Sequence, residues 1–186
     1  MRKVVLLGDS IREEGYGKSV ASALENDFEV WQPDDNCRYA KYTLRGLYDW
    51  QHHIDGVDII HWNNGLWDVS RILDGETFTP IEQYVAEMVR LAKMLQRRAK
   101  VVIFATTTPV LEGNPNFMHN EDVDAFNAAL VPELRKLGIV IDDLNALVSE
   151  DPERYICADR THLSGDGIAA CAEQVEACIR RLAEKM

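Results

Sequence analysis

The stretch KVVLLGDSI, residues 3–11, determines the fold that we expect. Its apolar half is short and uniformly hydrophobic, which is typical of a strand buried on both faces of a parallel sheet. A glycine ends this half, and polar residues follow it. Four more short apolar runs recur along the chain, at Phe28–Trp31, Val57–His61, Val101–Ala105 and Ile139–Ile141. We therefore predict five strands, of which Val4–Leu7 is the first.

Amphipathic stretches lie between these runs, and several begin with residues that favour helix starts. Thr79 precedes Pro80 and is followed three residues later by a glutamate, which is the pattern of a capping box. Asn120 and Ser164 are the predicted caps of two further helices. Two shorter helices are expected over residues 18–25 and 41–52.

The alternation of strands and helices predicts an α/β fold in one domain over residues 1–186. We expect a three-layer α/β/α sandwich around a five-stranded parallel sheet. Right-handed crossovers leave few topologies, and the flavodoxin-like strand order 2-1-3-4-5 is the one that we predict.

Composition and charge exclude several classes of protein. The formal net charge of −11 opposes binding to nucleic acid or to an anionic membrane, because phosphate recognition needs clustered Lys and Arg. No apolar run approaches the ~20 residues that span a bilayer. No signal peptide is expected, and the four cysteines lack C-x-x-C spacing, so we predict reduced thiols in a cytoplasmic protein and neither a metal site nor a cofactor.

Polar residues follow the predicted strands at their carboxyl ends, where this class of sheet binds its ligands. A serine hydroxyl needs a base to take its proton, and the base needs a third group that fixes its tautomer. Ser10 after the first strand, with His162 and Asp159 before the last helix, can fill these three roles. The backbone N–H of Ser10 and the side-chain amide of Asn63 are the expected donors to a developing oxyanion.

These segments resemble the conserved blocks of the SGNH hydrolases, also called GDSL-type esterases and lipases, over essentially the whole chain. GDSI at residues 8–11 is similar to the block that carries the nucleophilic serine. HWNN at residues 61–64 is similar to the block Gly-x-Asn-Asp, whose first Asn maps onto Asn63. DRTH at residues 159–162 is similar to the block Asp-x-x-His. The resemblance implies a serine esterase that forms an acyl-enzyme on Ser10.

One block departs from the family pattern, because the segment after the second predicted strand lacks the glycine whose N–H completes the oxyanion hole. Residues 35–39 read DNCRY. A backbone N–H does not require glycine, so Cys37, or else Arg38, is the expected donor there.

Aromatic and polar residues around the candidate site favour a sugar ring over a long acyl tail. His61, Trp62, Asn64 and Trp67 are the expected substrate contacts, and Arg12 and Tyr16 follow the nucleophile. The expected substrate is therefore a small-molecule or carbohydrate ester, with a short O-acetyl group as the acyl part.

Two alternatives remain open at this stage. A thioesterase or lysophospholipase would act on longer acyl chains with the same residues. A non-catalytic flavodoxin-like binding module would hold a nucleotide or flavin, but it needs a phosphate cradle after the first strand, where this chain has Glu13 and Glu14.

Overall fold

A computed structural model describes residues 1–186, and its centre is a five-stranded parallel sheet with the order β2-β1-β3-β4-β5. The strands are β1 (Arg2–Leu7), β2 (Phe28–Trp31), β3 (Val57–Trp62), β4 (Ala99–Ala105) and β5 (Val140–Asp142). The predicted fold class and strand order are confirmed. Every predicted strand is present, and the bounds differ by at most two residues because the ladder extends past the apolar run.

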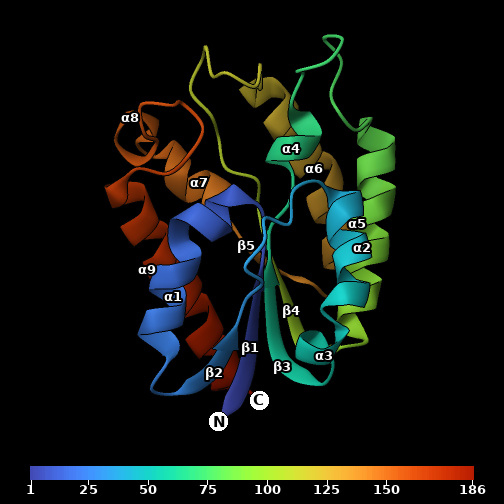
Figure 1. Cartoon of the computed structure of the whole chain (residues 1–186), viewed down its shortest axis with the longest axis vertical. Helices are drawn as coiled ribbons and strands as arrows, with labels where there is room; N and C mark the ends of the chain where they lie inside the picture. The colour runs from blue at the N-terminus through green and yellow to red at the C-terminus, as the bar shows by residue number, and fades with distance from the viewer.

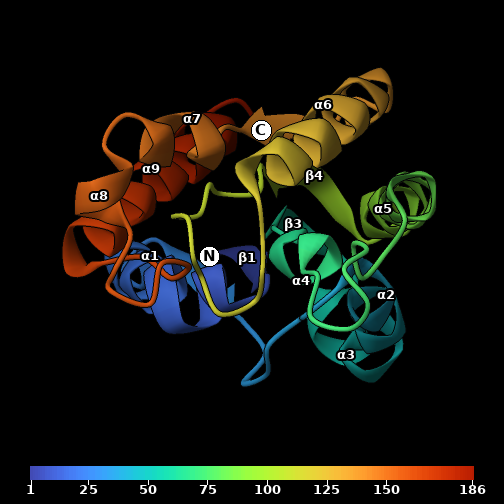
Figure 2. The ribbon, with the colours of Figure 1, turned by 90° about the horizontal axis from the view of Figure 1, so that it is seen from above.

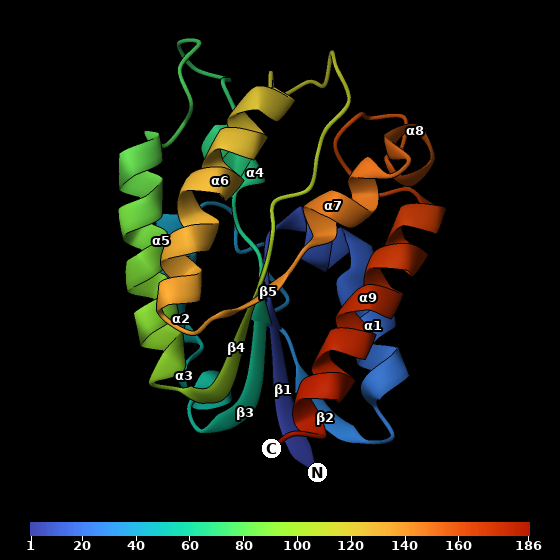
Figure 3. The same ribbon diagram turned by 180° about the vertical axis from the view of Figure 1, so that it is seen from behind.

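Helices cover both faces of the sheet and make the three layers (Figure 1). One face carries α1 (Gly17–Leu24), α7 (Leu144–Ser149), α8 (Pro152–Tyr155) and α9 (Gly165–Ala183). The other face carries α2 (Ala40–Asp49), α3 (Gln51–Ile54), α5 (Ile81–Gln96) and α6 (Asn120–Lys136), with α4 (Leu66–Val69) near the upper end of the sheet. The same arrangement is seen from behind in Figure 3. None of these helices combines the length and the apolar character that spanning a bilayer requires.

Two of the three predicted helix caps are wrong, and both residues make tertiary contacts instead. Thr79 donates its hydroxyl to Asp68 Oδ1 at 2.7 Å and makes no cap hydrogen bond to α5. Asn120 bonds both polar atoms of Val110, so the carboxamide holds the loop after β4. Ser164 does cap α9, because its Oγ accepts from Gly167 N at 3.1 Å. At Thr79 and Asn120 the side chain satisfies a polar group outside the helix instead of a backbone N–H of its first turn.

The loops after β3 and β4 rise above the carboxyl ends of the strands, at the end of the molecule opposite both termini (Figures 1 and 2). The apolar core lies below them, between the sheet and the two helical layers, and contains most side chains of β1 and β3. A rigid sheet therefore carries irregular segments at one end, which is where such folds place their ligand sites.

Candidate functional site

Strand pairing brings the segments after β1 and β3 side by side. Leu7 pairs with Trp62 in the parallel ladder, and Asn63 N donates to Leu7 O at 3.2 Å just beyond it. Ser10 follows β1 by three residues, at the start of a short irregular π-helical segment, η1 (Ile11–Tyr16). The turn after β1 and the Asn63 backbone therefore share one edge of the sheet.

Ser10, His162 and Asp159 form a continuous hydrogen-bonded chain. His162 Nε2 lies 2.8 Å from Ser10 Oγ, and His162 Nδ1 lies 2.7 Å from Asp159 Oδ2. With the proton on Nδ1, the ring donates to the carboxylate and leaves Nε2 free to accept from the serine hydroxyl. The fold thus brings Ser10 and His162 into contact although they are 152 residues apart in the sequence.

Asp159 is held in its ionised form by the turn that contains it. Burial by itself would raise the pKa of Asp159, but the backbone N–H groups of His162 and Thr161 outweigh this effect and hold the pKa well below its usual range. Both N–H groups donate to Oδ1 at 2.9 Å, which leaves Oδ2 for the imidazole. An ionised carboxylate in this position fixes the tautomer of His162 and stabilises the imidazolium when it forms.

Asn63 is buried beside this chain, with its amide nitrogen turned toward Asp9. Asn63 Nδ2 donates to Asp9 Oδ1 at 2.7 Å, and Asp9 also accepts from Ile11 N at 3.0 Å. Burial raises the pKa of Asp9 to about 6, and the hydrogen bonds from Asn63 and Ile11 oppose this rise. One of the two amide protons of Asn63 is thereby committed, and the second remains available.

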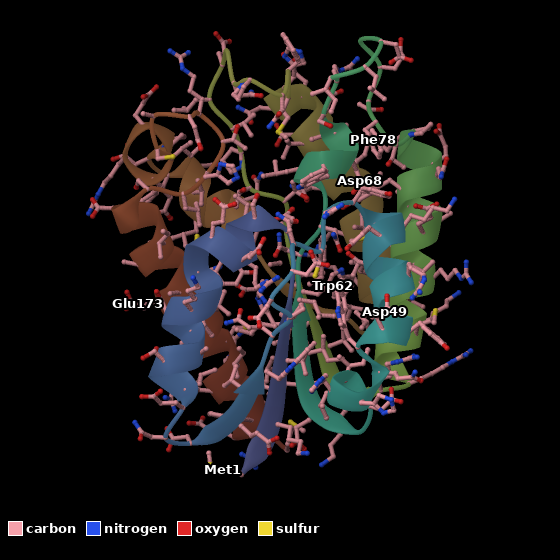
Figure 4. The ribbon with its side chains drawn as sticks, in the orientation of Figure 1. Met1, Asp49, Trp62, Asp68, Phe78 and Glu173 are labelled. Atoms are coloured by element: carbon pink, nitrogen blue, oxygen red, sulfur yellow. The ribbon has the colours of Figure 1, made fainter.

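Three expected substrate contacts are buried structural residues. Trp62 is fully buried and packs against Phe104, with ring centroids 4.9 Å apart, inside the molecule (Figure 4). His61 is equally buried, and its Nε2 lies 3.1 Å from Asp142 Oδ2. Asn64 has no exposed surface and bonds Thr43 and the Arg38 carbonyl. These three assignments are wrong, because none of the side chains has surface left to contact a substrate.

Arg12 and Tyr16 are likewise buried and cannot face a sugar. The Arg12 guanidinium instead holds the turn after β1 to the segment after β2. It donates to Gly8 O at 3.1 Å, to Pro33 O at 3.0 Å and to Asp35 O at 2.6 Å. No signal in the sequence distinguishes this arginine from a surface one, since its partners are backbone carbonyls.

The expected oxyanion donor Cys37 is wrong, because its backbone N–H already donates to Gly8 O at 3.0 Å. The N–H of Arg38 donates to Asn36 Oδ1 at 2.8 Å and is occupied as well. The backbone N–H of Asn36, in contrast, donates to no acceptor in the protein. Asn36 also lines the cleft that contains Ser10.

That cleft has a volume of about 290 Å³ and contains both Ser10 and His162. Trp67, the fourth expected substrate contact, lies in its wall with 39% of its surface exposed. A small organic ligand fits such a volume. No group of three or more acidic, His or Cys side chains is arranged to hold a metal ion.

Asp68 anchors the loop that forms one side of the cleft. Its carboxylate accepts from Ala40 N at 3.1 Å and from Thr79 Oγ1 at 2.7 Å, so it ties α4 to the start of α2 and to the end of the loop. Figure 4 shows Asp68 and Phe78 together at the same end of the molecule as the cleft. Burial raises the pKa of Asp68 to about 7, against the opposing hydrogen bonds from Thr79 and Ala40.

This raised pKa predicts a pH-dependent stability. Between pH 4 and 7 the unfolded chain ionises Asp68 while the folded protein keeps it protonated, so the free energy of unfolding falls as pH rises through this window. The asparagine of an Asp68→Asn variant cannot ionise, so the stability of wild type relative to the variant should fall by on the order of 3 kcal/mol from pH 4 to pH 7. Urea unfolding of both proteins at the two pH values measures the difference. An unchanged difference between the two proteins would mean that Asp68 titrates normally.

Solved structures that share this fold include esterases and an acylhydrolase. An acetyl xylan esterase named AlAXEase superposes with a TM-score of 0.76 at 18% identity, over 95% of this chain and 99% of that one. The acetylxylan esterase Axe2 from Geobacillus stearothermophilus gives a TM-score of 0.73 at 17% identity, over 94% and 92% of the two chains. A lipase/acylhydrolase from Enterococcus faecalis gives 0.76 at 17% identity, over 96% and 95%.

These likenesses establish the fold over nearly the full length of the chain. The sequence itself matches no protein-family model and no curated protein. The chemistry of this protein is therefore argued from its own residues.

Proposed function

We propose that this protein is a carboxylic ester hydrolase that works through an acyl-enzyme on Ser10. The observation that carries the proposal is the hydrogen-bonded chain from Ser10 through His162 to Asp159, with distances of 2.8 and 2.7 Å. A serine, a base and an orienting carboxylate in this geometry make an activated nucleophile. The two acetyl xylan esterases and the lipase/acylhydrolase that share the fold agree with this chemistry.

In the proposed reaction His162 removes the proton of Ser10 as Oγ attacks the ester carbonyl carbon. The tetrahedral intermediate collapses when the protonated His162 gives its proton to the leaving alcohol, and the acyl group stays on Ser10. Water, deprotonated by His162, then attacks the acyl carbon. The bond from that carbon to Ser10 Oγ breaks, His162 returns the proton to Oγ, and the carboxylic acid is released. Asp159 stays ionised through both halves, because its two backbone hydrogen bonds favour the charged form.

Three donors serve the oxyanion in this proposal. The backbone N–H of Ser10 and the free amide proton of Asn63 keep the roles expected of them. The backbone N–H of Asn36 takes the role expected of Cys37, since it has no acceptor in the protein and its residue lines the cleft. Loss of one such donor typically lowers kcat by ~10²–10³.

The proposed substrate is a short-chain ester of a carbohydrate, most simply an O-acetyl sugar. Trp67 offers a partly exposed aromatic face in the cleft wall, and Glu14, Asn36, Ser70 and Asn116 surround it with polar groups. An aromatic face with polar neighbours binds a sugar ring by stacking and hydrogen bonding. Two of the structural neighbours are acetyl xylan esterases.

A second candidate, hydrolysis of longer acyl esters, is favoured by the apolar part of the same cleft. Leu66, Ile72 and Met118 line it together with Trp67, and Ile72 is half exposed. Such a wall gains free energy from each buried methylene of an acyl chain.

A chain-length series of p-nitrophenyl esters, run beside an acetylated xylo-oligosaccharide, separates the two candidates. We expect kcat/KM to be highest for acetate and to fall about tenfold or more by octanoate, because the open cleft gives a long chain no enclosed tunnel. The acetylated sugar should release acetate with saturation kinetics. A rate that rises from acetate to octanoate would instead assign the cleft to an acyl chain.

A further inference from the structure

The Asn63 side chain is held at both of its polar atoms by buried groups. Its nitrogen donates to Asp9 Oδ1 at 2.7 Å, and its oxygen accepts from the Tyr16 hydroxyl at 3.0 Å. Burial raises the pKa of Tyr16 well above its ordinary value, so the phenol remains a donor at any working pH. Because an ionised carboxylate only accepts and this phenol donates, the two partners define which end of the amide is nitrogen.

Close packing also restricts the Asn63 amide. Tyr16 is fully buried and packs edge-on against His61, with ring centroids 5.7 Å apart and an interplanar angle of 89°. Gly8 lies so close that a Cβ there would overlap the Asn63 carbonyl oxygen. The amide oxygen is therefore packed against Gly8 and bonded to a phenol that is itself fixed by packing.

We infer that Tyr16 is a positioning residue for catalysis, acting through Asn63. The inference rests on the proposed function, in which the second amide proton of Asn63 donates to the oxyanion. By donating to Oδ1, Tyr16 keeps that proton aimed at the cleft. The same hydrogen bond draws electron density toward the amide oxygen and makes the N–H a stronger donor, because linked hydrogen bonds polarise one another. Tyr16 is fully buried, and its hydroxyl bonds Asn63 rather than the nucleophile.

A Tyr16→Phe variant tests the inference by removing only the hydroxyl. We expect kcat on p-nitrophenyl acetate to fall about 3- to 10-fold, the range that corresponds to the net contribution of one hydrogen bond, with KM unchanged. A contact made mainly with the transition state lowers kcat in this way, whereas a looser fold would alter KM or the active fraction. Titration with an organophosphate that phosphorylates the active serine gives the active fraction.

Tyr84→Phe is the matched control. Tyr84 is equally buried, and its hydroxyl donates to the backbone carbonyl of Asn64, the residue next to Asn63, at 3.0 Å. The variant loses a comparable buried hydrogen bond without touching the Asn63 amide, so its kcat should stay within about twofold of wild type. Equal losses in the two variants would overturn the inference, since they would reflect only the weaker packing.

A double-mutant cycle with Asn63→Ala completes the test. If Tyr16 acts through Asn63, adding Tyr16→Phe to Asn63→Ala should lower kcat no further. Losses that multiply would overturn the inference. The outcome is separable from the proposed function: if Ser10→Ala abolishes hydrolysis and Tyr16→Phe does not lower kcat, only the role of Tyr16 falls, whereas an active Ser10→Ala overturns both.

Discussion

Replacing Ser10 by alanine is expected to lower kcat for ester hydrolysis by about 10⁴-fold or more while the protein stays folded. The variant removes the oxygen that would attack the carbonyl carbon, and His162 Nε2 loses the partner that lies 2.8 Å away. The fold should be retained because the serine lies at the start of η1, lines the cleft and is not part of the apolar core. The residual rate should be that of water attack assisted by the oxyanion donors and His162.

The measurement is the initial rate on p-nitrophenyl acetate, with thermal unfolding followed on the same samples. Ser19→Ala is the matched control, because Ser19 is an exposed serine on α1. It should behave as wild type. A Ser10→Ala protein that keeps a rate close to wild type would remove Ser10 as the nucleophile and would direct attention to a directly activated water.

Asp159→Asn is expected to lower kcat by about 10⁴, the loss found for this substitution in a Ser-His-Asp arrangement. The loss follows from the hydrogen bonds of the turn. Two backbone N–H groups require an acceptor at Oδ1, so the amide nitrogen of the new asparagine must face His162 Nδ1. It donates there and forces the ring proton onto Nε2, which can then no longer accept from Ser10.

The stability of the Asp159→Asn variant should change little, because its oxygen still accepts both backbone hydrogen bonds. Asp124→Asn, an exposed aspartate on α6, is the matched control and should leave kcat unchanged. NMR of the imidazole nitrogens reports the tautomer directly. An Asp159→Asn enzyme with full activity, or with the proton still on Nδ1, would show that Asp159 does not set the tautomer.

The strands and the strand order could be predicted from the sequence because they depend on local patterns and on general rules of chain connection. Short apolar runs such as Val4–Leu7 have few alternatives once helices flank them. Helix starts were less predictable. Thr79 and Asn120 are good caps in isolation, but each bonds a buried residue earlier in the chain, Asp68 (11 residues before Thr79) and Val110 (10 residues before Asn120).

The proximity of Ser10, His162 and Asp159 could also be predicted, since each follows a segment that the fold brings to one edge. The direction in which a side chain points at that edge could not. His61 and Trp62 belong to the same strand end as Asn63, yet the pleat of β3 and the turn after it send them into the core. The backbone N–H that remains free near Cys37 depends on how the segment after β2 packs against the turn after β1. No residue pattern in the sequence predicts that packing.

The loops that meet there do so around Arg12, and this has a consequence for engineering. A graft of the segment after β2 from another hydrolase, made to change the specificity of this protein, would replace only one of two segments that depend on each other. The carbonyls of Pro33 and Asp35 in this segment are held in place by hydrogen bonds from Arg12, which lies two positions after Ser10. The nucleophile turn and the donor segment are therefore better exchanged together, as a single cassette, than one at a time.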